Sequence, residues 1–229
     1  MRIGGIQKLT LLDYPGKVAC TVFTVGCNFR CPFCHNASLV THTEDAPDLG
    51  EEDVLSFLSK RKGIIEGVCI TGGEPLIWPE TVDLLRKIKS MGYSVKLDTN
   101  GSFPKRLADI MDAGLADYIA MDIKSSPQNY ALAAGCENAL ESVKESVLLL
   151  LNGKIPFEFR TTVVKGLHTP ADIEDIAAWI VGAERYYLQG FRDSGDLIGS
   201  GLAAFTPEEM IQLLTSARKY LPNTEIRGE

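Results

Sequence analysis

Three cysteines stand close together in one short segment, at Cys27, Cys31 and Cys34. Thiolates with this C-x3-C-x2-C spacing can converge on one soft metal centre, and cysteine is the usual protein ligand of iron–sulfur clusters. A closed four-ligand site would need a further partner, and His35 adjoins Cys34 too closely to provide it easily. A four-iron cluster held by three cysteines would leave one iron free to bind something else.

The triplet is also compatible with simpler roles. A structural zinc site would need Cys20, Cys69 or His35 as its fourth ligand. The thiols could also be inert and buried, although free cysteines rarely gather where a strand runs into a loop. A disulfide framework is disfavoured because the N-terminus shows no secretory signal, and Cys136, like Cys20 and Cys69, stands alone in the sequence.

A pair of glycines follows a second apolar run, in the sequence Thr71-Gly72-Gly73-Glu74-Pro75. Glycines let a backbone approach a ligand closely, and the Glu74 carboxylate can accept a hydrogen bond from an ammonium group. A bare Gly-Gly is usually only a turn, but its position after a strand favours a binding role here.

Polar and charged side chains end the next two predicted strands. Asp98 and Asn100 share one side of their strand by the period of two, and Asp122 and Lys124 share one side of the following strand. A lone Asp-x-Lys pair is more often a surface salt bridge. Two neighbouring strands that both end in carboxylates nevertheless predict a polar rim, because buried charges need partners.

Arg160 lies inside an apolar strand, where an arginine requires an anion. That anion is either the carboxylate of a ligand or a structural partner, such as Glu158 or a residue on a neighbouring strand. The residues alone leave both interpretations open.

Strands alternate with helices along most of the chain, which predicts a parallel sheet with right-handed crossovers. Core strands are expected at residues 18–25, 68–71, 93–98, 116–123, 157–164 and 185–189, with an edge strand at 6–10. Helices are expected at about 51–62, 79–91, 104–113, 138–151, 170–180 and 206–220.

The length of this pattern predicts the fold class. Six strand–helix units span residues 18–190, about 29 residues each, which is near the size of one such unit. A full eight-unit barrel takes about 250 residues. We therefore expect an α/β fold with a partial, open parallel (β/α)6 barrel, in a single domain of residues 1–229 with a C-terminal helix at about 206–220. Ligands of such sheets bind at the carboxyl ends of the strands, where the cysteine segment follows the first core strand.

Composition excludes some classes of partner. The net charge is −7 and no long basic run occurs, so a nucleic-acid partner is not expected. The apolar runs are too short for a membrane span. We expect a cytoplasmic protein whose cysteines serve metal or redox chemistry.

The cysteine triplet also resembles the signature of radical S-adenosylmethionine (SAM) enzymes. More narrowly, the sequences of residues 11–17, LLDYPGK, and 26–32, GCNFRCP, resemble those of glycyl-radical-enzyme activases. The most similar subgroup is the longer type of anaerobic ribonucleoside-triphosphate reductase activating protein, and the resemblance extends from about Ile6 to Arg192.

The resemblance implies cofactors and binding residues. It implies one [4Fe-4S] cluster on Cys27, Cys31 and Cys34, and SAM beside it. The residues that would surround SAM are Gly72, Gly73, Glu74, Asp98, Asn100, Asp122, Lys124, Arg160 and Gln189. Gln189 falls where some relatives carry histidine, which leaves a ribose contact at this position open. In some activases the matching carboxylates, the following threonine and a carbonyl of the fourth strand hold a monovalent cation, for which Asp98, Thr99 and Asp122 are the candidates here.

The activity implied is reductive cleavage of SAM, followed by removal of a hydrogen atom from a glycine α-carbon in a partner glycyl radical enzyme. Reduced flavodoxin or ferredoxin would supply the electron, and an anaerobic setting would preserve the radical. No side chain is expected to act as a catalytic acid or base, because the cluster and SAM carry the chemistry.

Three alternatives to this activity stay open. The partner could be a pyruvate formate-lyase-like enzyme. The chain could be a radical SAM enzyme that acts on a small molecule or nucleotide, such as an enzyme of the queuosine pathway. It could also be a metal-binding or electron-transfer module without enzymatic activity, which would leave the glycine pair and the strand-end carboxylates unexplained.

Overall fold

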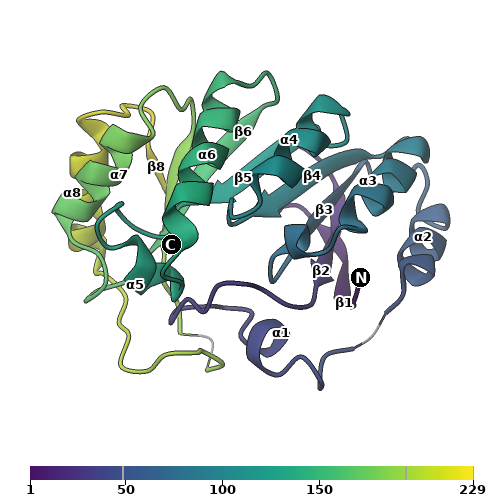
Figure 1. Ribbon diagram of the computed structural model, residues 1–229, viewed down its shortest axis with the longest axis horizontal. Helices are drawn as coiled ribbons and strands as arrows, with labels where there is room; N and C mark the ends of the chain where they lie inside the picture. Colours follow the sequence, from purple (N-terminus) through teal and green to yellow (C-terminus); the bar gives the residue numbers. More distant parts are fainter. Residues whose placement is uncertain (48, 194, 229) are drawn as a thin grey trace.

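The computed structural model describes residues 1–47, 49–193 and 195–228, which form one curved sheet with helices around it (Figure 1). The sheet has eight strands, and their spatial order follows the chain from β1 to β8. β1 runs antiparallel to β2, and every later neighbour is parallel. The strands are β1 Ile3–Thr10, β2 Ala19–Thr24, β3 Gly67–Gly72, β4 Ser94–Thr99, β5 Tyr118–Asp122, β6 Phe157–Val163, β7 Tyr186–Gly190 and β8 Glu225–Arg227.

Helices connect the parallel strands and cover the outer side of the sheet (Figure 1). They are α1 Ser38–Thr41, α2 Glu51–Ser59, α3 Thr81–Ser90, α4 Pro104–Asp112, α5 Tyr130–Ala134, α6 Ala139–Asn152, α7 Pro170–Trp179 and α8 Pro207–Arg218, with a 3-10 turn η1 at Pro75–Ile77. α7 and α8 each begin with a threonine, a proline and a capping box, so the sequence itself fixes where these helices start.

The prediction of an α/β fold with a partial parallel barrel is confirmed. The six expected core strands correspond to β2–β7. In the described residues β1 and β8 are the two ends of the sheet and do not pair with each other, so the barrel is open. The short strand β8 and the short helices α1 and α5 were not expected, because segments of three to five residues carry too little periodicity.

The two faces of the sheet differ sharply in polarity. On β4, Val95 and Leu97 point outward into the hydrophobic core beneath the helices, whereas Lys96 and Asp98 point inward. The same alternation places Asp122 of β5 and Arg160 of β6 on the inner face, directly paired in the parallel register. The inner face is therefore a polar trough, and this trough positions the candidate site.

None of the helices in the described part of the chain combines the length and the apolar character that crossing a bilayer would require.

Candidate functional site

A cavity of about 370 Å³ opens where the parallel strands end. Its walls come from the loop after β2 and from the carboxyl ends of β3 to β7. The structure brings these predicted site residues together in its lining: Cys27, Cys31, Cys34, Gly72, Gly73, Asp98, Thr99, Asn100, Asp122, Lys124, Arg160 and Gln189. Glu74 is the predicted residue that does not line it.

The three cysteines of the loop carry free thiols on the wall of this cavity. Burial is the main cause that raises the pKa of Cys27 to about 12 and that of Cys31 to about 11. The backbone N–H of Phe29 and the side-chain amide of Asn100 lie 3.3 and 3.7 Å from the Cys27 sulfur. These donors suit a sulfur that carries negative charge when it binds a metal, and metal binding would release the thiol protons.

The donor set fits an iron–sulfur cluster better than a zinc ion. Among the described residues, no three His, Cys, Asp or Glu side chains converge closely enough for a single metal ion. Cys20 packs in the core on the outer face, and Cys69 lies beside Lys96, so neither lines the cavity with the triplet. Three sulfurs spaced around one cavity match a larger group that reaches each of them.

The glycine pair holds the cysteine loop against the end of β3. Gly72 has φ +121°, and a Cβ there would lie 2.3 Å from the Thr24 nitrogen. A Cβ on Gly73 would lie 2.0 Å from the Gly26 oxygen. The pair is therefore required for close approach between two protein backbones, in addition to any contact with a ligand.

Two remote segments support the cysteine loop from other sides. The Arg30 N–H donates to the Ala134 carbonyl of α5 at 2.9 Å, and Gly135 packs against the Arg30 carbonyl. The Gly199 N–H donates to the Pro32 carbonyl at 2.8 Å. The position of the cysteines thus depends on parts of the chain far away in sequence.

Glu74 is fully buried behind the cavity wall. Its carboxylate accepts hydrogen bonds from the N–H of Leu76 at 3.0 Å, the hydroxyl of Thr99 at 2.8 Å and the N–H of Asn100 at 2.6 Å. Burial nevertheless raises the pKa of this carboxyl to about 7. The expected contact of its side chain with a ligand ammonium does not fit this placement, because the carboxylate joins the η1 turn to the end of β4 instead.

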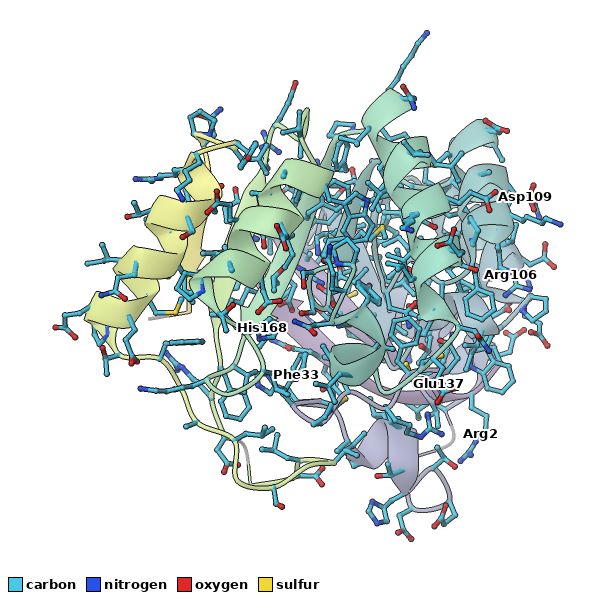
Figure 2. The ribbon with its side chains drawn as sticks, turned by 60° about the vertical axis from the view of Figure 1, so that its left-hand side comes forward. Arg2, Phe33, Arg106, Asp109, Glu137 and His168 are labelled. Carbon is cyan, nitrogen blue, oxygen red and sulfur yellow. The ribbon has the colours of Figure 1, made fainter. Side chains whose placement is uncertain are left out.

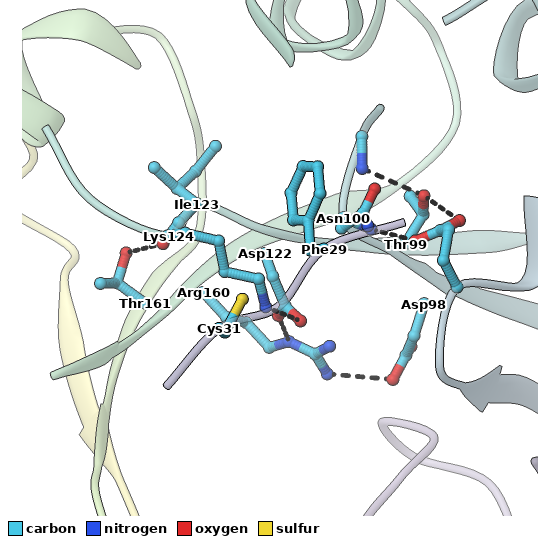
Figure 3. A network of polar contacts seen from close by, with 12 residues as sticks. Phe29, Cys31, Asp98, Thr99, Asn100, Asp122, Ile123, Lys124, Arg160 and Thr161 are labelled. Atoms are coloured by element: carbon cyan, nitrogen blue, oxygen red, sulfur yellow. Dashed lines mark hydrogen bonds and ion pairs between the residues drawn. The ribbon is translucent and has the colours of Figure 1, made fainter. Parts of the chain in front are cut away.

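Arg160 lies between the two strand-end aspartates (Figure 3). Its Nε donates to Asp122 at 2.9 Å and a terminal nitrogen donates to Asp98 at 3.2 Å. The structural ion pair with neighbouring strands is therefore present, and Arg160 also lines the cavity. Burial alone would raise the pKa of both aspartates, because it disfavours the charged form. The positive charges of Arg160 and the nearby lysines have the larger effect and hold the pKa of each carboxyl below its usual range.

The monovalent cation predicted on Asp98, Thr99 and Asp122 does not fit the donor atoms as they lie. The two carboxylates come together, but Arg160 already spans them. The Thr99 hydroxyl donates to Glu74 on the outer side of the strand.

Sequence reasoning missed Lys96, a third cation next to this pair. Its ammonium group bonds to Asp98 and lies 3.8 Å from the Cys69 sulfur, and its side chain is only 2% exposed. The period of two that placed Asp98 on the inner face also places Lys96 there, so this residue could have been found.

His168 was also assigned no role from the sequence, and the structure gives it a positioning contact. Its Nδ1 accepts the Val164 N–H at 3.0 Å, so its Nε2 carries the proton and donates to the Lys124 carbonyl at 2.8 Å. Its ring lies beside Phe33 of the cysteine loop, with ring centroids 6.0 Å apart (Figure 2). His168 thus connects the end of β5 with the cysteine loop, a contact that no sequence pattern indicates.

Comparison with known proteins adds three findings. The family model of the radical SAM superfamily matches residues 21–180. A Methanocaldococcus jannaschii protein named "Putative glycyl-radical enzyme activating enzyme" is 30% identical over 232 residues, which cover 98% of this chain and 95% of that protein. The pyruvate formate-lyase-activating enzyme of Clostridium pasteurianum is 32% identical over 128 residues, 54% of this chain and 52% of that enzyme.

A solved structure has a similar fold. The crystal structure of SuiB from Streptococcus suis superposes with a TM-score of 0.71 at 13% identity, over 90% of this chain and 47% of that chain. This likeness concerns the architecture of the sheet and its helices.

Proposed function

This chain belongs to the radical SAM superfamily, and we propose that it is an activase that installs a glycyl radical in a partner enzyme. The partner we propose is an anaerobic ribonucleoside-triphosphate reductase. The observation that carries the activase assignment is the match along 98% of the chain to a relative named for glycyl-radical enzyme activation. The choice of partner rests on the resemblance of residues 11–17 and 26–32.

The cavity offers separate positions for the two cofactors of such an enzyme. Cys27, Cys31 and Cys34 would hold a [4Fe-4S] cluster, and the strand-end residues would hold SAM. When bound, the two together supply a carbon radical that removes a hydrogen atom from a substrate C–H bond. The size of the cavity, about 370 Å³, is within the range of small-ligand pockets.

The residues of the chain orient and shield these groups. Lys124 and Arg160 line the cavity, with side chains 18% and 14% exposed, and they suit the carboxylate of SAM. Gly72 and Gly73 present backbone groups beside the cysteines, and Asn100 and Gln189 offer neutral hydrogen-bonding groups. Glu74 lies outside the cavity lining and fixes the position of Asn100, whose N–H donates to its carboxylate.

Transfer of a hydrogen atom needs no catalytic acid or base. This agrees with the charged side chains of the cavity lining, which form ion pairs with one another. We propose that the protein works in the cytoplasm of an anaerobic or facultative host, as a single domain of residues 1–229. We further propose that reduced flavodoxin or ferredoxin supplies its electron.

The test begins with the purified chain, reconstituted anaerobically with iron and sulfide and supplied with SAM and a strong reductant. We expect 5′-deoxyadenosine from the wild type and none from the variant Cys27→Ala/Cys31→Ala/Cys34→Ala. A well-formed four-iron cluster without any deoxyadenosine would contradict the proposed enzymatic activity.

The partner is then identified by electron paramagnetic resonance. The reaction is repeated with a purified anaerobic ribonucleotide reductase and, separately, with a pyruvate formate-lyase. A glycyl radical doublet on the reductase supports the proposed partner, and a doublet on the lyase alone replaces it. Deoxyadenosine formation stimulated by a metabolite, with no protein radical, would favour a small-molecule substrate.

A further inference from the structure

We propose that Lys96 is a built-in cation of the strand-end site: it neutralises Asp98 in the place of a bound monovalent metal ion, beside Arg160, which bridges Asp98 and Asp122. The protein would then need neither sodium nor potassium at this position. The inference concerns the same site as the proposed function and rests on that function only for its activity measurement.

The carboxylate oxygens of Asp98 and Asp122 already have cationic partners within the protein. Sodium, potassium and similar hard cations need oxygen ligands. One oxygen of Asp98 accepts from Lys96 and the other from Arg160. One oxygen of Asp122 accepts from Arg160 and the other from Lys124. All four carboxylate oxygens are thus engaged by side-chain cations of the protein.

The Thr99 hydroxyl also has partners within the protein. This hydroxyl donates to Glu74 at 2.8 Å and accepts the Gly101 N–H at 3.1 Å. Both partners belong to the packing behind the cavity wall. Each side-chain oxygen predicted to bind the metal ion therefore already has a partner within the protein.

The charges of these five side chains also disfavour a bound metal ion. Asp98 and Asp122 carry two negative charges, whereas Lys96, Arg160 and Lys124 carry three positive charges. The group has a surplus of positive charge before any metal ion enters. A further cation at this position would meet repulsion from a guanidinium group that touches both aspartates.

Lys96 differs from the other two cations in its burial. Its side chain is 2% exposed, against 14% for Arg160 and 18% for Lys124. Arg160 and Lys124 line the cavity, where a ligand can contact them, but Lys96 does not line it. When a ligand engages Arg160 and Lys124, Lys96 remains to neutralise Asp98. This is why we assign the role of the fixed cation to Lys96.

The first experiment uses the metal-free chain, so it does not depend on cofactors or activity. Thermal unfolding is measured for the wild type, Lys96→Met, Lys96→Gln and the control Lys105→Met, which alters an exposed lysine of α4. Each protein is measured in potassium chloride and in tetramethylammonium chloride at equal ionic strength, because tetramethylammonium is too large for a carboxylate site.

We expect the wild type and Lys105→Met to melt at the same temperature in both salts. Both Lys96 variants should melt lower in tetramethylammonium and recover part of the loss in potassium, which can now reach Asp98. Specific stabilisation of the wild type by potassium would overturn the proposal. So would folded Lys96 variants that show no preference between the two salts. If neither variant folds, the wild-type measurement alone decides between these outcomes.

The second experiment measures deoxyadenosine formation by the reconstituted proteins across a potassium titration. We expect potassium to change the rate of deoxyadenosine formation by less than about twofold for the wild type. For Lys96→Met we expect at least about tenfold stimulation, because potassium would restore a buried ion pair that the substitution removes. Wild-type activity that requires potassium would overturn the role of Lys96. Absence of product in every salt would count against the proposed function, while the melting experiment would still decide the question of Lys96.

Discussion

Glu74 and Asp98 are carboxylates on adjoining elements, yet their partners give them opposite tendencies to ionise. Both side chains are removed from solvent, and burial disfavours the charged form of each. Glu74 has only neutral donors, so its pKa rises to about 7. Asp98 contacts Lys96 and Arg160, which hold its pKa below the usual range. Of these two carboxyls, the one that contacts cations is therefore held in its charged form.

The raised pKa of Glu74 predicts a specific pH dependence of stability. The folded protein keeps this proton up to about pH 7, whereas an unfolded glutamate releases it near 4.5. The free energy of unfolding therefore falls as the pH rises between these values. Glu74→Gln removes this titration. The free energy of unfolding of the wild type minus that of the variant should therefore fall by about 3 kcal/mol between about pH 5 and pH 8.

This prediction is measured by chemical denaturation of both proteins across the pH range. The exposed Glu137 provides the matched control (Figure 2), because Glu137→Gln makes the same chemical change outside the site. A difference between wild type and Glu74→Gln that stays constant with pH would show that the carboxyl titrates normally.

Sequence reasoning succeeded where the backbone period alone decides the direction of a side chain. Asp98, Asp122 and Arg160 reach the cavity because alternate residues of a strand share a face. The surroundings of Glu74 could not be predicted, because its partners come from the η1 turn and from the end of β4. Whether a carboxylate faces a ligand or a neighbouring loop depends on packing between elements.

At the scale of elements, the cysteine loop is supported by a helix that joins it from a distant part of the chain. The carbonyl of Ala134, the last residue of α5, accepts a hydrogen bond from the Arg30 N–H. Gly135 follows with φ +59°, and a Cβ on it would lie 2.3 Å from the Arg30 oxygen. A glycine is required here both for the left-handed backbone and for the close approach.

Gly135→Ala is therefore expected to disturb the cysteine loop. Gly114→Ala is a close control, because Gly114 also has a positive φ, +62°, but a Cβ added there would have no atom within 4 Å. The control should lose about 1 kcal/mol from backbone strain alone. Gly135→Ala should lose more stability and should also bind less iron and sulfide after anaerobic reconstitution.

Both effects are measured on the same samples, by thermal unfolding and by iron and sulfide analysis. Equal losses of stability in the two variants, with the same iron content, would show that the contact between α5 and Arg30 does not support the loop.

The longer elements could be predicted because their periodicity, caps and glycine stops agree with one another. α8 begins after Thr206 with the expected capping box, and β2 to β7 follow the expected alternation of strand and helix. The supporting role of α5 could not be predicted. A helix of five residues is stabilised by what it packs against, and local sequence does not reveal that partner.

At the scale of the whole molecule, one ion pair attaches the last strand to the interior of the barrel. Arg227 of β8 donates two hydrogen bonds to Glu158 of β6, at 2.8 and 3.0 Å, and its guanidinium lies over the ring of Tyr187. The Glu158 side chain is 1% exposed, whereas that of Arg227 is 34% exposed. The strand β8 has only three residues, so this contact is a large part of its attachment.

Arg227→Met should destabilise the protein by about 2 kcal/mol, because it leaves the buried Glu158 carboxylate without its cation. This loss is smaller than the usual cost of a broken buried pair because Arg227 is partly exposed. Adding Glu158→Gln to Arg227→Met should restore part of the loss. A double-mutant cycle by chemical denaturation checks this coupling, and strictly additive effects would contradict it.

The order of the strands in the sheet has a consequence for folding during synthesis on the ribosome. Because spatial order follows chain order, each new strand finds its neighbour already synthesised. The cysteines emerge early, but the Ala134 carbonyl that contacts Cys31 emerges 103 residues later. The cysteines of the nascent loop are thus synthesised long before the α5 residues that hold the loop in place. Stable binding of iron by the loop must therefore wait until most of the chain has been made.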